Sequence, residues 1–155
     1  MVTDTTADTV IQADVGNSLV CLAASHTGVA QPTDKRNTAM NTRELATAFT
    51  DMLKAGNLED AVQFNSPDIV SIEAMEGPMA EVRGTDAVKA KSDWWYGAHE
   101  VHSVETFGPF INGDRFALRF YMDVTNRESG QRMQMEEIGL YTVKDGKIVE
   151  ERFFY

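Results

Sequence analysis

The 155-residue chain carries 24 acidic against 14 basic residues, a formal net charge of −10 and 43% hydrophobic residues. This size and apolar content indicate one globular domain, and the lack of clustered Lys and Arg excludes nucleic acid and an anionic membrane surface as partners. Cys21 is the only cysteine, which excludes an intrachain disulfide and a thiolate metal cluster. No apolar run reaches the length of a membrane span and no basic stretch of a signal peptide is present, so we expect a cytoplasmic protein that needs no metal.

The first 39 residues are rich in Thr, Asp, Ala and Ser and show weak periodicity. Such a composition is typical of a loosely ordered segment, with one short helical piece expected near residues 17–25. The hydrophobic pattern becomes regular from Met40. We therefore predict an N-terminal extension over residues 1–39 and one folded domain over residues 40–155.

Helical spacing precedes strand-like alternation in the folded part. Leu45, Phe49 and Leu53 recur as on an amphipathic helix, and we expect Thr42 to cap its start. Asn112-Gly113 and Asp145-Gly146 are typical two-residue hairpin turns. In chain order we expect helices over residues 42–55 and 58–64, strands over 68–75 and 79–82, a helix over 85–96, and strands over 99–111, 115–126, 131–143 and 147–155. This order predicts an α+β domain with its helices gathered on one face of a curved antiparallel sheet.

The last two hairpins allow the strand register to be counted. Apolar residues at every second position from Phe116 to Val124 predict the inward face of that strand. A turn over residues 127–130 then places Phe120 opposite Glu137. Counting from Asp145-Gly146 places Tyr141 opposite Glu150, Gly139 opposite Arg152 and Glu137 opposite Phe154. The count puts Glu137 and Arg152 on the inward face.

A carboxylate among Phe120, Met135 and Phe154 loses solvation, which raises its pKa and makes Glu137 a candidate proton donor or acceptor. Arg152 on the same face could hold Glu137 charged or bind an oxyanion, with room left by Gly139. Two other interpretations stay open. Glu137 and Arg152 could form a structural ion pair, or a bulge could turn Glu137 to solvent.

Trp94-Trp95-Tyr96 ends a predicted helix, so one ring should pack in the core while another lines a pocket mouth or a dimer contact. His102 is predicted opposite Asp123, which could orient the imidazole as a general base. The alternative is a pair at the surface or in a dimer interface. His99 and His102 point to opposite faces of a strand, which argues against a zinc site.

Two further groups of charged residues fall outside this inward face. Glu73 and Glu76 follow a strand and are expected on a solvated rim. Arg119 and Tyr121 alternate with the apolar face, so they should point outward, where Arg119 could pair with Glu136 or meet a second subunit.

The element order, together with three short segments, resembles the SnoaL-like polyketide cyclases of the nuclear transport factor 2 and ketosteroid isomerase superfamily. The segments are Gly84-Thr85-Asp86-Ala87-Val88, Asn112-Gly113-Asp114-Arg115-Phe116-Ala117-Leu118 and residues 143–151. The resemblance implies a cone-shaped α+β barrel whose sheet wraps three helices around an apolar pocket, often dimeric and without a metal or organic cofactor. It also implies an acidic residue on the next-to-last strand, a position that falls here at Gly139, one inward step from Glu137.

The leading hypothesis is a cofactor-free isomerase, cyclase or hydrolase that moves a proton on an apolar or aromatic carbonyl compound. Glu137 would move the proton, Arg152 would tune Glu137 or bind an oxyanion, and Tyr141 would donate a hydrogen bond. The walls would come from Trp94, Trp95, Phe120 and Met135. The alternatives are a non-catalytic ligand-binding or dimerisation module, and a protein-docking role for the outer sheet face.

Overall fold

The computed structural model describes residues 39–155, so the predicted extension and its helical piece lie outside the described part. Its elements are α1 (Thr42–Lys54), α2 (Leu58–Ala61), the 3-10 helix η1 (Val62–Phe64), β1 (Asn65–Ile72), β2 (Glu81–Arg83), α3 (Thr85–Ala98), β3 (His99–Asn112), β4 (Arg115–Asn126), β5 (Arg132–Lys144) and β6 (Lys147–Phe154). The predicted order is confirmed. The structure differs at several boundaries: β1 covers Asn65–Ile72 rather than residues 68–75, β2 covers Glu81–Arg83 rather than residues 79–82, and α3 ends at Ala98 rather than at residue 96.

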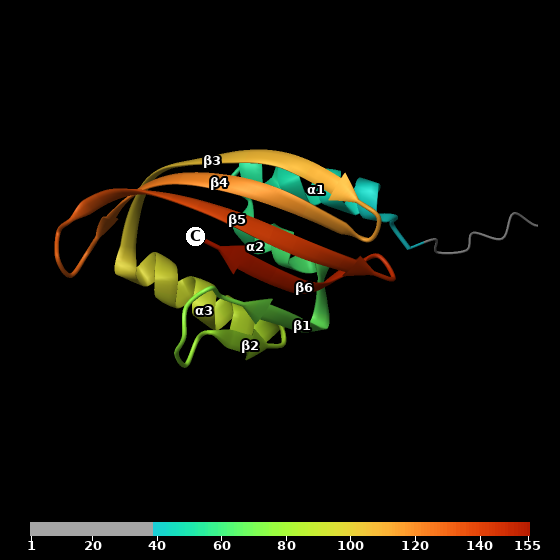
Figure 1. Ribbon diagram of the computed structural model, residues 1–155, viewed down its shortest axis with the longest axis horizontal. Helices are drawn as coiled ribbons and strands as arrows, with labels where there is room; N and C mark the ends of the chain where they lie inside the picture. Colours follow the sequence, from blue (N-terminus) through green and yellow to red (C-terminus); the bar gives the residue numbers. More distant parts are fainter. Residues whose placement is uncertain (1–38) are drawn as a thin grey trace, which may run out of the picture. The chain divides into compact units, whose positions relative to one another are not determined.

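The strands form one sheet in the order β2-β1-β6-β5-β4-β3 (Figure 1). Helix α1 packs against β3 and β4, and α3 packs against β1, β2 and β3. The α+β cone-like fold is confirmed, with two departures from a closed antiparallel barrel. The sheet is open, and β1 pairs with β6 in parallel. No helix among residues 39–155 is long and apolar enough to cross a membrane.

Helix α1 begins with a capping box. The Asn41 side chain accepts a hydrogen bond from the Glu44 backbone N–H, and the Glu44 carboxylate accepts one from the Asn41 N–H. Two donors at the helix start are thereby satisfied. The cap is Asn41 rather than the expected Thr42. From this start the helix turns Leu45 and Phe49 onto the sheet, where both are buried.

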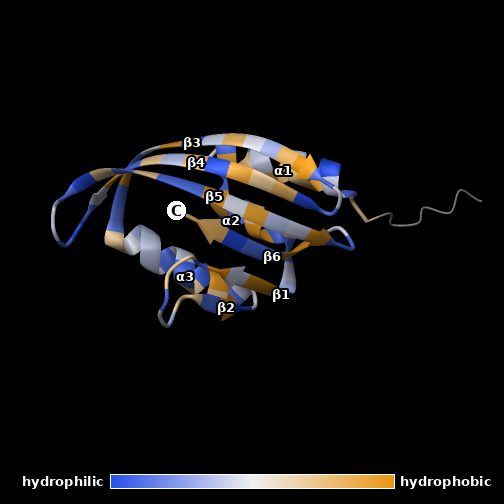
Figure 2. Ribbon diagram, in the orientation of Figure 1, coloured by the Kyte–Doolittle hydropathy of each residue, from blue (hydrophilic) through white to orange (hydrophobic). Residues whose placement is uncertain are grey.

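The core lies between α1 and the inward face of the sheet, which is the face that packs on the helices. The Phe49 ring meets the rings of Phe64, Phe116 and Tyr141 edge to face, with centroids 5.2 to 6.0 Å apart. Such pairs add about 0.5–1.5 kcal/mol beyond the burial of their area. Hydrophobic residues, orange in Figure 2, recur along the strands and on α1. The site described below borders this core.

The predicted register of β4 and β5 is confirmed, with Phe120 opposite Glu137 and Leu118 opposite Gly139. The two hairpin turns differ in outcome. Asp145 and Gly146 form the predicted turn with φ of 52° and 73°, whereas the β3–β4 hairpin turns one residue later than expected. The expected register of β5 and β6 holds only at the turn. Beyond the pair of Val143 and Ile148, a bulge at Val149 shifts every pair by one residue.

Candidate functional site

Polar side chains gather on the inward face of the sheet next to the aromatic core. The pairing places Tyr141 beside Glu151, and Glu151 beside Ser71 on the parallel neighbour β1. Ser71 is fully buried and Glu151 is 9% exposed. The Ser71 hydroxyl donates a 2.6 Å hydrogen bond to the Glu151 carboxylate. We call Ser71, Glu73, Lys91, Glu137, Tyr141 and Glu151 the inner-face cluster.

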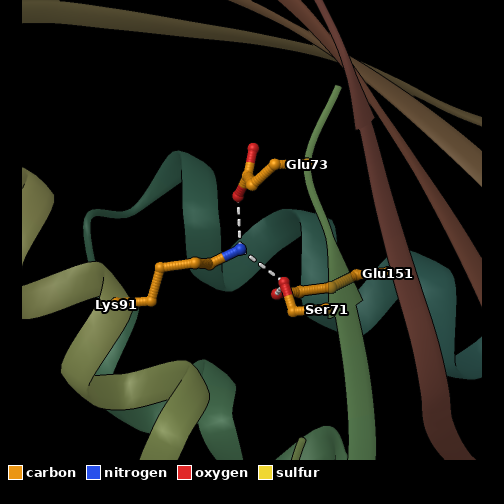
Figure 3. A network of polar contacts seen from close by, with 4 residues as sticks. All are labelled: Ser71, Glu73, Lys91 and Glu151. Atoms are coloured by element: carbon orange, nitrogen blue, oxygen red, sulfur yellow. Dashed lines mark hydrogen bonds and ion pairs between the residues drawn. The ribbon is translucent and has the colours of Figure 1, made fainter. Parts of the chain in front are cut away.

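Helix α3 contributes the one ammonium of this cluster (Figure 3). The Lys91 Nζ donates a 2.5 Å hydrogen bond to the Ser71 hydroxyl and forms an ion pair with Glu73. The same Nζ lies 4.9 Å from the centroid of the Phe153 ring, a cation–π contact. Lys91 is only 9% exposed because it shares the sheet-facing stripe of α3 with Val88.

Glu137 lies on the inward face, half-buried, and makes no hydrogen bond or ion pair with any residue of the described part. Burial, the largest cause, acts together with nearby Glu73 and Glu151 and against Lys91, and the net effect raises the pKa of Glu137 to about 7. A carboxyl with this pKa exchanges protons readily near neutral pH. Burial also raises the pKa of Glu151, against the Ser71 hydrogen bond and Lys91.

Tyr141 occupies the space that Gly139 leaves open. A Cβ built on Gly139 would lie 2.8 Å from the Tyr141 hydroxyl oxygen, so the phenol extends over the glycine toward Glu137. Burial raises the pKa of Tyr141 well above 10, with Glu151 and Glu137 acting in the same direction. The phenol therefore stays protonated and can donate a hydrogen bond.

Of the four predicted wall residues, the structure places Phe120 and Met135 beside Glu137. Phe120 is its cross-strand neighbour and packs against the core, and Met135 lies on the same face of β5. Trp95 is half-buried and stacks on His99, with ring centroids 4.7 Å apart. Trp94 is 56% exposed and points away from the core. Burial raises the pKa of the Tyr96 hydroxyl, and the nearby Glu137 carboxylate raises it further, which places Tyr96 close to Glu137.

Arg152 does not lie on the inward face, which corrects the expected position. Because of the bulge in β6, Arg152 pairs with Leu140 on the outward side, where its guanidinium lies 3.7 Å from Glu150. Glu151 and Phe153 take the inward positions instead. Arg152 therefore neither pairs with Glu137 nor uses the space at Gly139.

The expected pairing of His102 with Asp123 is also wrong. A bulge at His102 leaves Ser103 opposite Asp123. The His102 Nε2 lies 2.8 Å from the Thr125 hydroxyl, and Asp123 accepts two hydrogen bonds from Arg132, at 2.8 and 2.7 Å. Neither residue joins the inner-face cluster, whereas the expected outward pair of Arg119 and Glu136 is confirmed at 2.8 Å.

Sequence reasoning missed Ser71, Lys91 and Glu151, and it placed Glu73 on a solvated rim. Glu73 instead pairs with Lys91 and its side chain is 15% exposed. One signal was available for Lys91, because Val88, Lys91 and Trp95 recur at helical spacing and share a stripe. No comparable signal marks Glu151, since the bulge that turns it inward lacks a glycine or proline.

Two open hollows lie away from this cluster. One is lined by Asp123, Arg132, Met133 and Gln134, and the other by residues 56–60. Both face solvent, and neither includes a residue of the inner-face cluster. Among residues 39–155, no group of three or more His, Cys, Asp or Glu side chains is placed to hold a metal ion.

The α+β fold is one that nuclear transport factor 2-like proteins share. The family model of the SnoaL-like domain matches residues 40–155, and the chain belongs to this family. A candidate SnoaL-like polyketide cyclase from Mesorhizobium loti, also described as a carbohydrate phosphatase, is 53% identical over 75% of this chain and 100% of that one, with a TM-score of 0.73.

More distant structures share the fold. A candidate SnoaL-like polyketide cyclase from Jannaschia sp. CCS1 is 18% identical, covers 79% of this chain and 90% of its own, and has a TM-score of 0.59. A nuclear transport factor 2-like protein from Burkholderia xenovorans LB400 is 17% identical, covers 73% and 87%, and has a TM-score of 0.56. No curated protein matches the sequence.

Proposed function

We propose that the protein binds a small, uncharged carbonyl compound beside Glu137 and catalyses a proton transfer on it without a metal or organic cofactor. The single observation that carries this proposal is the Glu137 carboxyl. It is half-buried, unpaired within the described residues, and has a pKa of about 7. A structural carboxylate at this depth would be expected to hold an ion pair, as Glu73 does with Lys91.

The proposed reaction uses two groups of the cluster. The Glu137 carboxylate takes a proton from the carbon next to the carbonyl group, and the electron pair of that C–H bond moves onto the carbonyl oxygen. The Tyr141 hydroxyl, which stays protonated, donates a hydrogen bond to the enolate oxygen that forms. In a conjugated enolate, Glu137 then returns the proton to a different carbon and the double bond shifts. Alternatively, the enolate carbon attacks a second carbonyl within the same ligand, and the alkoxide that forms takes the proton back from Glu137.

The surroundings of Glu137 favour an apolar ligand. Phe120 lies across from it on β4, and Met135 is its neighbour on the same face. Met side chains adapt to the shape of a ligand, and aromatic rings stack on flat ones. Tyr96 and Trp95 at the end of α3 form an edge-to-face pair 5.1 Å apart that would border the entrance.

Deuterium exchange at the carbon next to the carbonyl tests this proposal directly. Wild-type protein would be incubated in D2O with a panel of uncharged ring ketones, and exchange would be followed by proton NMR. Glu137→Gln should reduce the exchange to the level without protein. Glu136→Gln, which changes an exposed neighbour on the opposite face, should leave it intact. Equal exchange in the Glu137→Gln variant, or no exchange of any ketone by wild type, would reject the proposal.

A homodimer is proposed as the assembly, because the outward face of the sheet carries an apolar row. Phe107, Ile138 and Phe154 lie in this row on three strands, and each is 44 to 48% exposed. Arg119 joins the row through a cation–π contact with Phe107 at 5.8 Å. Exposed apolar residues that line up across strands are typical of an interface. The same face could serve a non-catalytic dimerisation module.

Light scattering during size-exclusion chromatography measures this assembly. Ile138→Glu should convert a wild-type dimer into a monomer, because a charge would enter the centre of the apolar row. Gln134→Glu adds the same charge to the same face of β5 near the far hairpin and should leave the dimer intact. A monomeric wild-type protein, or a dimer that survives Ile138→Glu, would reject this interface.

A further inference from the structure

Lys91 stands out because its ammonium is held from several sides. Its Nζ donates to the Ser71 hydroxyl at 2.5 Å, forms an ion pair with Glu73 and lies over the Phe153 ring. We propose that Lys91 is a positioning residue of the Glu137 site, whose fixed positive charge keeps the Glu137 carboxyl able to lose its proton at neutral pH. This inference rests on the proposed role of Glu137 as a base.

The helix places Lys91 there at a cost that a surface lysine avoids. Lys89, two residues earlier and on another side of α3, is 57% exposed at its side chain and pairs with Asp93 in solvent. Lys91 instead has 11% of its side chain exposed and faces the sheet. Burying an ammonium loses several kcal/mol of hydration, so partners must compensate for it. Ser71 and Glu73 supply that compensation and fix the ammonium at one point.

The titratable groups that face Glu137 lie on or next to β1, α3, β5 and β6, whereas β4 contributes the apolar Phe120. They are Glu73 after β1, Lys91 and Tyr96 on α3, Tyr141 on β5, and Glu151 and Tyr155 on and after β6. Lys91 is the one cation among them, against three carboxylates including Glu137 itself. The Lys91 Nζ lies over the Phe153 ring, and Phe153 pairs with Gly139, one inward step from Glu137 on β5. From this position Lys91 favours the ionised form of Glu137, whereas Glu73 and Glu151 disfavour it. Without the ammonium, Glu137 would be protonated at pH 7 and could not accept a proton.

A purely structural role for Lys91 makes a different prediction. In that case the ammonium only neutralises Glu73 and Glu151 in the interior, and its loss would lower stability without altering how Glu137 titrates. The two roles therefore separate in the titration curve of Glu137. That curve can be measured without any substrate, so its outcome does not depend on whether the proposed reaction occurs.

The test is a carbon-13 NMR titration of glutamate carboxyl groups in the full chain, with the Glu137 signal assigned by its loss in Glu137→Gln. Lys91→Met keeps the length of the side chain and removes the charge. It should raise the pKa of Glu137 by about one unit, which lowers the ionised fraction at pH 7 from about half to about a tenth. Lys89→Met on the same helix should leave the curve in place. An unchanged curve in a folded Lys91→Met protein would overturn the proposal.

A second pair of variants applies if Lys91→Met does not fold because Glu73 is left unpaired. Glu73→Gln removes that carboxylate. In the double variant Glu73→Gln, Lys91→Met, the loss of the ammonium therefore leaves no unpaired charge at position 73. The pKa of Glu137 should be higher in the double variant than in Glu73→Gln alone. Equal values would overturn the proposal. If the wild type catalyses no deuterium exchange of any ketone, but the pKa of Glu137 still rises without Lys91, the proposed function is rejected and the effect of Lys91 on Glu137 stands.

Discussion

The Ser71 hydroxyl donates a 2.6 Å hydrogen bond to the Glu151 carboxylate across the parallel pairing of β1 and β6. The two residues are 80 positions apart in the sequence, and both are buried. Ser71 also accepts the hydrogen bond from Lys91, so one small side chain connects the two strands to α3. The arrangement satisfies the buried hydroxyl fully, as a donor and as an acceptor.

Ser71→Ala should destabilise the fold. The substitution leaves the Glu151 carboxylate without its donor and removes one acceptor from Lys91, and an unsatisfied buried polar group costs about 1–3 kcal/mol. Urea unfolding followed by circular dichroism measures the difference. Ser103→Ala on β3, where the side chain is exposed, should change the free energy of unfolding by less than about 0.5 kcal/mol. Similar losses in both variants would contradict the burial of the Ser71 hydrogen bonds.

Glu137 should make the protein less stable as the pH rises. Its pKa is about 7 in the folded state and near 4.5 when unfolded, so between these values the folded state binds more protons than the unfolded state. Stability from this group is therefore full below pH 4.5, falls as the pH rises toward 7 and stays low above it, by about 3 kcal/mol in total. Glu137→Gln should remove this fall, and should be the more stable protein at pH 8.

The measurement is the free energy of unfolding by urea at pH 5 and pH 8. The difference between wild type and Glu137→Gln should be larger at pH 8, with Gln the more stable. Glu136→Gln, on the exposed face, should follow wild type at both values. A Glu137→Gln protein that loses stability at pH 8 would mean that the carboxylate is held by partners, contrary to its position here.

Gly139→Ala should push the Tyr141 ring out of position. The added Cβ would lie 2.8 Å from the hydroxyl oxygen and 3.0 Å from two ring carbons, so the phenol must move, at a cost of about 1–3 kcal/mol. Tyr141→Phe removes the closest of these atoms. In a double-mutant cycle, Gly139→Ala should therefore cost less in the Tyr141→Phe background than in wild type. Strictly additive losses would contradict the contact.

Arg152→Met should have little effect on the inner-face cluster. The guanidinium lies on the outward side and is 3.7 Å from Glu150, with 42% of its side chain exposed. Exposed ion pairs of this kind contribute about 0–1 kcal/mol. The carbon-13 titration of Glu137 should be the same as in wild type, in contrast with Lys91→Met. A shifted curve would place Arg152 on the inward face after all.

Much of the fold could be predicted because its signals are local. Period-two apolar residues on β4 fixed the inward face, and the Asp145-Gly146 turn fixed the start of the last hairpin. The opposition of Phe120 and Glu137 follows from the β4 pattern and the turn over residues 127–130, and it is confirmed. The Asn41 cap lay one residue from the predicted one because Asn and Thr both serve as caps, and the Glu44 partner decides between them.

The rest of the site depends on contacts that have no local signal. A bulge changes strand parity with one extra residue, and neither the bulge near Thr142 nor the one at His102 contains a glycine. The extra residues are Val149 in β6 and His102 in β3. The first turns Arg152 outward, and the second separates His102 from Asp123. Helical spacing could have shown that Lys91 faces the sheet, but its partners Ser71 and Glu73 lie 20 and 18 residues earlier in the sequence, and no local signal reveals that contact.

One residue of β6, Val149, stands outside the ladder between the pairs Thr142–Glu150 and Val143–Ile148. If Val149 paired with Thr142 instead, every later residue of β6 would turn over, and Glu150 and Arg152 would replace Glu151 and Phe153 on the interior side. That wall would gain a guanidinium and lose an aromatic ring while the order of the strands stays the same. The single unpaired residue thus decides whether the wall beside Tyr141 is anionic or electrically neutral.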